Sequence, residues 1–148
     1  MNKLITDVTY EQDFYAWLLN CAQLLRERRF AELDTENMAE ELEGMARSDK
    51  RELVSRFAVL LAHLLKWRFQ PDLRSKSWKR TIKEQRKRIK MLLQDSPSLK
   101  YEIDAKINDA YELAVLSAAS ETGFDEEVFP STCEYLIEQI LDDEFYPD

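Results

Sequence analysis

The sequence predicts an all-α fold, a single-domain antiparallel helical bundle of five to six helices. Three observations support this class. Apolar residues recur at spacings of three and four along most of the chain, which is the period of a helix with one buried face. Two Gly and four Pro in 148 residues argue against a turn-rich β architecture. The length suits one domain with a sizeable core, so we expect residues 1–148 to form a single all-α domain.

The predicted bundle is organised around a central helix at residues 49–70. Leucine, valine and phenylalanine side chains form a wide stripe there, and Ala62 and Trp67 widen it until most of the circumference is apolar. Such a helix is typically the central one of a bundle. Pro71 is expected to end it, because the residue before a proline is pushed away from helical geometry.

The predicted helices cover residues 9–29, 35–47, 49–70, 77–94, 97–120 and 132–143. Their expected N-caps are Thr9, Asp34, Ser77, Ser96 and Ser131, which are residue types that accept a hydrogen bond from the first turn. Gly44 and Ser48 weaken the helical pattern, so we expect a kink or short turn near residue 48. Gly123 is expected to end the fifth helix.

The first two helices carry apolar side chains that we expect to be buried. These are Phe14, Trp17, Leu18, Cys21, Leu24 and Leu25 in the first helix and Met38, Leu42 and Met45 in the second. Cys21 lies on this face and is interpreted as a small core residue.

Charge is divided unevenly along the chain, whose net charge is −8. Residues 66–100 contain 12 basic and 3 acidic side chains, and the last 48 residues contain one lysine and 14 acids. The candidate basic surface consists of Arg74, Lys76, Lys79, Arg80, Lys83, Lys87 and Lys90. Either an anionic partner or the acidic helices of the same chain could neutralise this surface, and the acidic net charge favours the internal explanation. The acidic tail is expected to fold back on the basic helix.

The start of the chain lacks the basic-then-apolar run of a signal peptide, and no stretch resembles a membrane span. We therefore expect a cytoplasmic protein without membrane association and with reduced cysteines.

One polar cluster is the candidate site. It gathers Asp34, Glu41, His63, Lys66, Gln70, Gln85 and Arg86 from the second, central and fourth helices. Carboxylates beside a lone imidazole could hold a divalent metal or act as an acid–base pair. We favour a buried polar network in which Glu41 pairs with His63 or Lys66 and Gln85 meets a polar group of the central helix or Glu41. No metal or other cofactor is therefore assigned.

Trp78 beside basic residues raises the alternative of nucleic-acid binding, with bases stacked on the indole. We disfavour it, because Trp78 also belongs to the apolar stripe of its own helix.

Several short motifs resemble a bacterial family called domain of unknown function 29. They are YEQDFYAWL, LDTENMAEELEGM, HLLKWRFQP, SWKRTIKEQR, DSPSL and FPSTCEYLIEQILDDEF, and together they cover nearly the whole chain. The family pattern falls on Tyr10, Asp13, Trp17, Asp34, Glu40, Glu41, Glu43, His63, Lys66, Trp67, Gln70, Pro71, Ser77, Trp78, Thr81 and Gln85. The resemblance implies an all-α fold of cytoplasmic bacterial proteins, common in photosynthetic bacteria, with no established activity.

We interpret the protein as a non-enzymatic interaction or regulatory module with a polarised basic and acidic surface. Its expected partner is another protein or a second copy of itself. The alternative is a metal-assisted hydrolase that acts on a phosphate-containing substrate through Asp34, Glu41 and His63.

Overall fold

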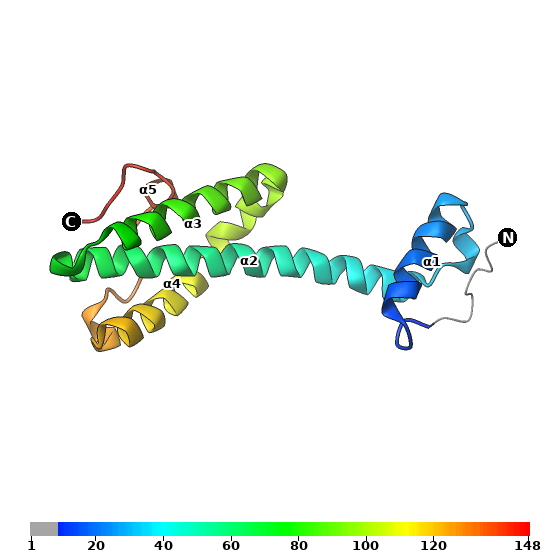
Figure 1. The fold of residues 1–148 in the computed structure, drawn as a ribbon, viewed down its shortest axis with the longest axis horizontal. Coiled ribbons are helices and arrows are strands. Elements are labelled where there is room, and N and C mark those ends of the chain that lie inside the picture. The colour runs from blue at the N-terminus through cyan, green and yellow to red at the C-terminus, as the bar shows by residue number, and fades with distance from the viewer. Residues whose placement is uncertain (1–8) are drawn as a thin grey trace. The chain divides into compact units, whose positions relative to one another are not determined.

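The computed structural model describes residues 9–148 and confirms the all-α prediction. The described part contains five α-helices and four short 3-10 helices, and no strand (Figure 1). The α-helices are α1 (Phe14–Arg26), α2 (Thr35–Phe69), α3 (Lys76–Asp95), α4 (Lys100–Thr122) and α5 (Ile137–Ile140). The 3-10 helices are η1 (Phe30–Glu32), η2 (Pro71–Leu73), η3 (Pro97–Leu99) and η4 (Glu126–Val128).

The chain divides into two compact units, Met1–Arg47 and Ser48–Asp148, and each is described by itself below. One domain over residues 1–148 stays a prediction. No described helix combines the length and the apolar character needed to cross a bilayer.

In the first unit, α1 begins later than the sequence predicts. Asp13, not Thr9, is the N-cap, and its carboxylate accepts a hydrogen bond from the backbone N–H of Ala16 at 3.0 Å. Residues 9–12 form a turn instead, closed by a hydrogen bond from the N–H of Gln12 to the carbonyl of Thr9 at 3.2 Å. A carboxylate with free access to the first-turn N–H groups is a strong cap, so the helix starts there.

The apolar face of the first unit is covered only in part. Trp17, Cys21 and Leu24 are buried as predicted. Met38 is half-buried, and the expectation is wrong for the five others, which are exposed. The exposed fractions are 44% for Phe14, 42% for Leu18, 43% for Leu25, 63% for Leu42 and 66% for Met45.

The predicted break near residue 48 is absent, and α2 runs without interruption from Thr35 to Phe69. A glycine inside a helix costs about 1 kcal/mol relative to alanine, which does not end a helix that is already nucleated. Two ion pairs at i,i+4 spacing support this stretch, Glu43–Arg47 at 3.9 Å and Glu52–Arg56 at 2.9 Å.

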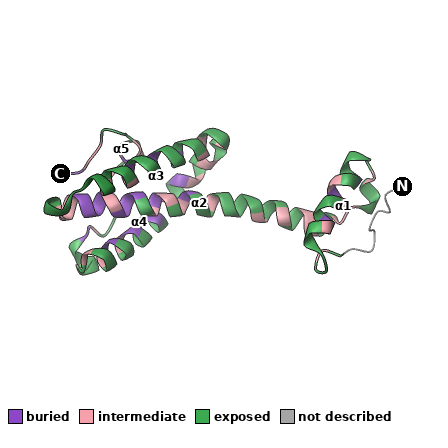
Figure 2. Cartoon of the chain, viewed as in Figure 1, coloured by how far each residue is buried: buried purple, intermediate pink, exposed green. Residues whose placement is uncertain are grey.

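In the second unit, α3 and α4 run along the C-terminal half of α2, and the buried residues of α2 lie in this half (Figures 1 and 2). The core consists of Leu53, Phe57, Leu60, Leu61, Ala62, Leu64, Leu65, Trp67, Ile82, Ile89, Ile103, Ala110, Tyr111, Ala114, Ala118, Phe129 and Ile140. The α2 helix ends at Phe69, as Pro71 predicted. The turn η2 then reverses the chain into α3.

Two helix boundaries of this unit test the capping predictions. The N-cap of α3 is Ser75 and not Ser77, because the hydroxyl of Ser75 accepts the N–H of Trp78 at 3.2 Å. Gly123 ends α4 in the left-handed conformation, with φ of 76°, as predicted.

The predicted helix at residues 132–143 is wrong in extent, because only the single turn α5 is helical. Ser131 is not its cap, and the chain from residue 131 to 136 forms bends. The Arg86 guanidinium instead binds the backbone carbonyls of Ile140, Asp143 and Phe145 and so holds the end of the chain in a largely non-helical path.

The two glycines of the chain should respond oppositely to alanine. Gly44→Ala should raise the free energy of unfolding by about 0.5–1 kcal/mol, because the position is helical and a Cβ there meets nothing closer than the Arg47 guanidinium at 3.7 Å. Gly123→Ala should lower it by about 1 kcal/mol, because its φ of 76° is strained for alanine. Urea denaturation of both variants checks the signs, and a destabilised Gly44→Ala would contradict the continuous helix.

Candidate functional site

The seven predicted cluster residues are divided between the two units, with Asp34 and Glu41 in the first and the other five in the second. Asp34 and Glu41 are engaged inside the first unit. Asp34 caps the start of α2 and accepts hydrogen bonds from the Trp17 indole at 3.1 Å and the Asn37 side chain at 2.8 Å. The bond from Asn37 is the main reason that the pKa of Asp34 is lowered. Glu41 accepts from the Tyr10 hydroxyl, and this bond raises the pKa of Tyr10.

The predicted pairing of Glu41 with His63 or Lys66 stays a prediction, because Glu41 lies in the first unit and the other two residues lie in the second. Lys66 is 6% exposed and its ammonium binds the carboxylate of Glu121 on α4. The same ammonium lies 5.1 Å from the centre of the Trp78 ring, so Trp78 packs against the core as predicted. The Nδ1 of His63 lies 2.9 Å from the backbone carbonyl of Val59.

Two other members of the cluster, Gln85 and Arg86, have hydrogen-bond partners within the second unit. Gln85 accepts a hydrogen bond from Arg56 of α2 at 3.3 Å, which confirms the prediction that its amide meets a polar group of the central helix. Arg86 is 1% exposed, and its guanidinium donates to the carbonyls of Ile140 and Phe145 at 2.7 Å each. Gln70 marks the end of α2 and has non-helical backbone angles.

These contacts describe local structural pairs. Within residues 9–148, no three or more His, Cys, Asp or Glu side chains are placed to hold a metal ion together.

All seven residues of the predicted basic surface are exposed. Five of them recur on α3 at spacings of four and three, which places them along one face of the helix: Lys76, Arg80, Lys83, Lys87 and Lys90. Internal neutralisation is partial. Lys90 binds Asp143 of the tail at 3.0 Å, and Arg68 lies 3.6 Å from Glu134. The tail thus folds back on α3 as predicted, whereas the other four lysines and arginines of this face form no ion pair with a described residue.

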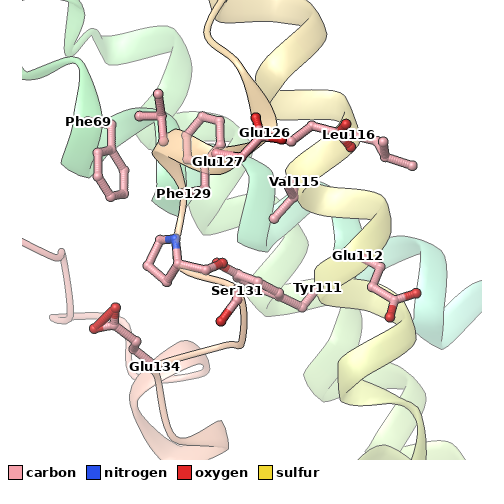
Figure 3. Close-up of a pocket in the computed structure, with 12 residues that line it drawn as sticks. Phe69, Tyr111, Glu112, Val115, Leu116, Glu126, Glu127, Phe129, Ser131 and Glu134 are labelled. Carbon is pink, nitrogen blue, oxygen red and sulfur yellow. The ribbon is translucent and has the colours of Figure 1, made fainter.

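A groove of about 840 Å³ lies between α4 and the segment that follows it in the second unit (Figure 3). Its apolar lining consists of Phe69, Val115, Leu116, Val128, Phe129 and Pro130. Its polar lining consists of Tyr111, Glu112, Glu126, Glu127, Ser131 and Glu134. The lining thus carries four carboxylates and no basic side chain.

The wall of this groove is fixed by one buried hydroxyl. Tyr111 donates a hydrogen bond to the carbonyl of Pro130 at 2.6 Å. Burial raises the pKa of Tyr111 to about 12, so this hydroxyl stays protonated and keeps its donor role at neutral pH. Phe69 and Phe129 pack edge to face, with ring centres 5.3 Å apart, and hold the loop against the end of α2.

The rim carboxylates are largely unpaired. Glu134 lies near Arg68, whereas Glu112, Glu126 and Glu127 are exposed and form no ion pair with any residue from 9 to 148. The sequence analysis did not identify this groove. The available signal was the run FDEEVFP, in which adjacent acids are enclosed by apolar residues, but the fold was needed to place it beside α4.

Comparison with known proteins decides the family. The family model described as Domain of unknown function DUF29 matches residues 9–146. The chain belongs to this family. No curated protein and no solved structure matches the sequence of this chain. Membership of the DUF29 family confirms the resemblance seen in the sequence motifs and assigns no activity.

Replacement of Arg86 should show how strongly the C-terminal segment depends on it. Arg86→Met should lower the free energy of unfolding by about 3 kcal/mol, because it leaves buried carbonyls without donors. Arg80→Met, on the same helix but exposed, is the matched control and should change it by less than about 0.5 kcal/mol. The free energy of unfolding is measured by thermal and urea unfolding. If Arg86→Met and Arg80→Met lowered it by the same amount, the anchoring role of Arg86 would be contradicted.

His63 should make stability depend on pH. Burial, assisted by the charge of nearby Lys66, lowers the pKa of His63 below its usual 6.5. Near pH 6.5 the unfolded chain therefore binds a proton at His63 more readily than the folded chain does. The contribution of neutral His63 to the free energy of unfolding is consequently lost as the pH falls below about 6.5. His63 is the sole histidine, so its NMR titration is unambiguous and should give a value below 6.5. His63→Gln should flatten the change in unfolding free energy between about pH 7 and 5.5; an unchanged slope would refute the link.

Proposed function

We propose that this DUF29 protein is a protein-interaction module and that the groove beside α4 binds a cationic amphipathic segment of another protein. The observation that carries the proposal is the combination of an apolar floor with a rim of carboxylates and no basic side chain. A helix with an apolar face commonly enters such a groove by that face.

The floor supplies the apolar part of the contact. Leu116 and Val128 are 53% and 46% exposed, and both line the groove. Covering exposed side chains of this size with a partner lowers the free energy of the complex. Their position beside the ordered ring pair of Phe69 and Phe129 gives the partner a rigid surface.

The rim supplies the choice of partner. Glu112, Glu126 and Glu127 lack ion pairs with described residues, and lysine or arginine of a ligand would supply them. Complementary charges at the edge of an interface raise the association rate and select against anionic ligands.

Other assignments have weaker support in the described residues. The hydrolase alternative has no group of metal-binding side chains there. Stacking of a nucleic-acid base on Trp78 has weaker support, because Trp78 is packed against the core and lies under Lys66.

The proposal is tested with a fluorescent synthetic peptide of about 18 residues that places leucine on one helical face and lysine on the other. Anisotropy should show binding that weakens as salt increases. The triple variant Glu112→Gln, Glu126→Gln, Glu127→Gln should bind about tenfold more weakly, because three rim ion pairs contribute about 0.5 kcal/mol each. Val128→Asp should weaken binding at least as much, because it places a charge on the apolar floor.

The control separates the groove from general attraction to an acidic protein. Glu36→Gln, Glu40→Gln, Glu43→Gln makes the same change in net charge on exposed positions of α2 in the first unit. It should bind the peptide like the unchanged protein. Equal weakening by both triple variants, or no effect of Val128→Asp, would refute the groove as the docking site.

A further inference from the structure

The helix α1 is apolar over more of its circumference than its own unit covers. At about 100° per residue, the buried residues Trp17, Cys21 and Leu24 occupy an arc of about 60°. A second apolar arc of about 140° adjoins it and is exposed. Its members are Phe14, Leu25, Leu18, Tyr15 and Leu19, which are 44%, 43%, 42%, 73% and 56% exposed.

An exposed apolar arc of this width indicates that another surface packs against the helix. A helix that is apolar nearly all round is typically buried on most sides, and large contiguous apolar patches on soluble proteins mark sites of association. The patch is larger than an isolated leucine, because five large side chains lie on the same face of the helix.

Charge indicates what covers it. Among the 13 residues of α1, Arg26 is the one charged side chain, whereas the whole chain has a net charge of −8. Two copies of an acidic protein repel each other over most surfaces. The middle of α1 is a place where two copies can meet without that repulsion.

The ends of α1 are complementary to each other. Glu11 and the N-cap Asp13 precede the helix, and Arg26 lies in its last turn, on the side of the exposed arc. When two α1 helices pack antiparallel about a twofold axis, Arg26 of each copy approaches the acidic start of the other. Such an isologous contact repeats each favourable pair twice.

We propose that the exposed arc of α1 is a homodimer interface, in which the α1 helices of two copies pack antiparallel. The interface lies in the first unit and is separate from the groove proposed for partner binding in the second. The predicted burial of Phe14, Leu18 and Leu25 is then met by the second copy, not by the chain itself.

The oligomeric state of the full chain tests this proposal by sedimentation equilibrium and light scattering. The unchanged protein should be a dimer. Leu18→Glu with Leu25→Glu should weaken dimerisation about a hundredfold or more, because four apolar side chains per dimer are replaced by charges. Its helical content by circular dichroism should stay the same, because glutamate is a good helix former and the buried side of α1 is untouched.

The matched control is Leu73→Glu with Leu113→Glu, which makes the same change at leucines of the second unit that are 58% and 50% exposed. This control should remain dimeric. A monomeric unchanged protein, a dimer that persists in the α1 variant, or equal dissociation of the control would overturn the proposal. A monomer in which Leu19→Cys resists thiol labelling would mean that the same chain covers the arc, which also overturns it.

A charge exchange tests the antiparallel arrangement. Arg26→Glu should weaken the dimer about tenfold, and Glu11→Lys combined with Arg26→Glu should restore it. Failure of the double variant to restore association would refute the antiparallel packing of the two helices.

Discussion

The C-terminal half of α2 sets the constraint on which the second unit depends. Nine of its side chains between Leu53 and Trp67 are buried, and Leu60, Leu61 and Leu64 are fully inaccessible. A helix of this kind needs neighbours around most of its circumference. The helices α3 and α4 provide two of them, and Phe129 and Ile140 from the C-terminal segment join the same core. The groove beside α4 exists because this segment must return to the core.

Two polar contacts hold that returning segment in place. Tyr111 binds the carbonyl of Pro130 at one end, and Arg86 binds carbonyls from Ile140 onward at the other. Burying a guanidinium is costly unless its donors are used, and here the acceptors are backbone groups. The segment is largely non-helical, and Glu126, Glu127 and Val128 on it are exposed.

The sequence predicted what hydrophobic periodicity and backbone stop signals determine. The helix class, the stop at Pro71 and the left-handed Gly123 follow from residues close in sequence or on one helical face. It could not predict the groove or the role of Arg86, because the carbonyls that Arg86 binds carry no residue signature. The partner of Lys66 was beyond prediction for a related reason: Glu121 lies 55 residues away in sequence, and the fold brings the two side chains together.

The misplaced burial of α1 is informative in a different way. The sequence pattern correctly identified Phe14, Leu18 and Leu25 as side chains suited to a dry environment, and the described chain leaves each more than two-fifths exposed. A covering second copy reconciles pattern and structure. It would also join two grooves in one particle, and linked binding sites raise the effective concentration of the second site for any partner that carries two cationic segments. Dimerisation through α1, whose one charged side chain is Arg26, would therefore strengthen docking at the acidic grooves without adding a contact to them.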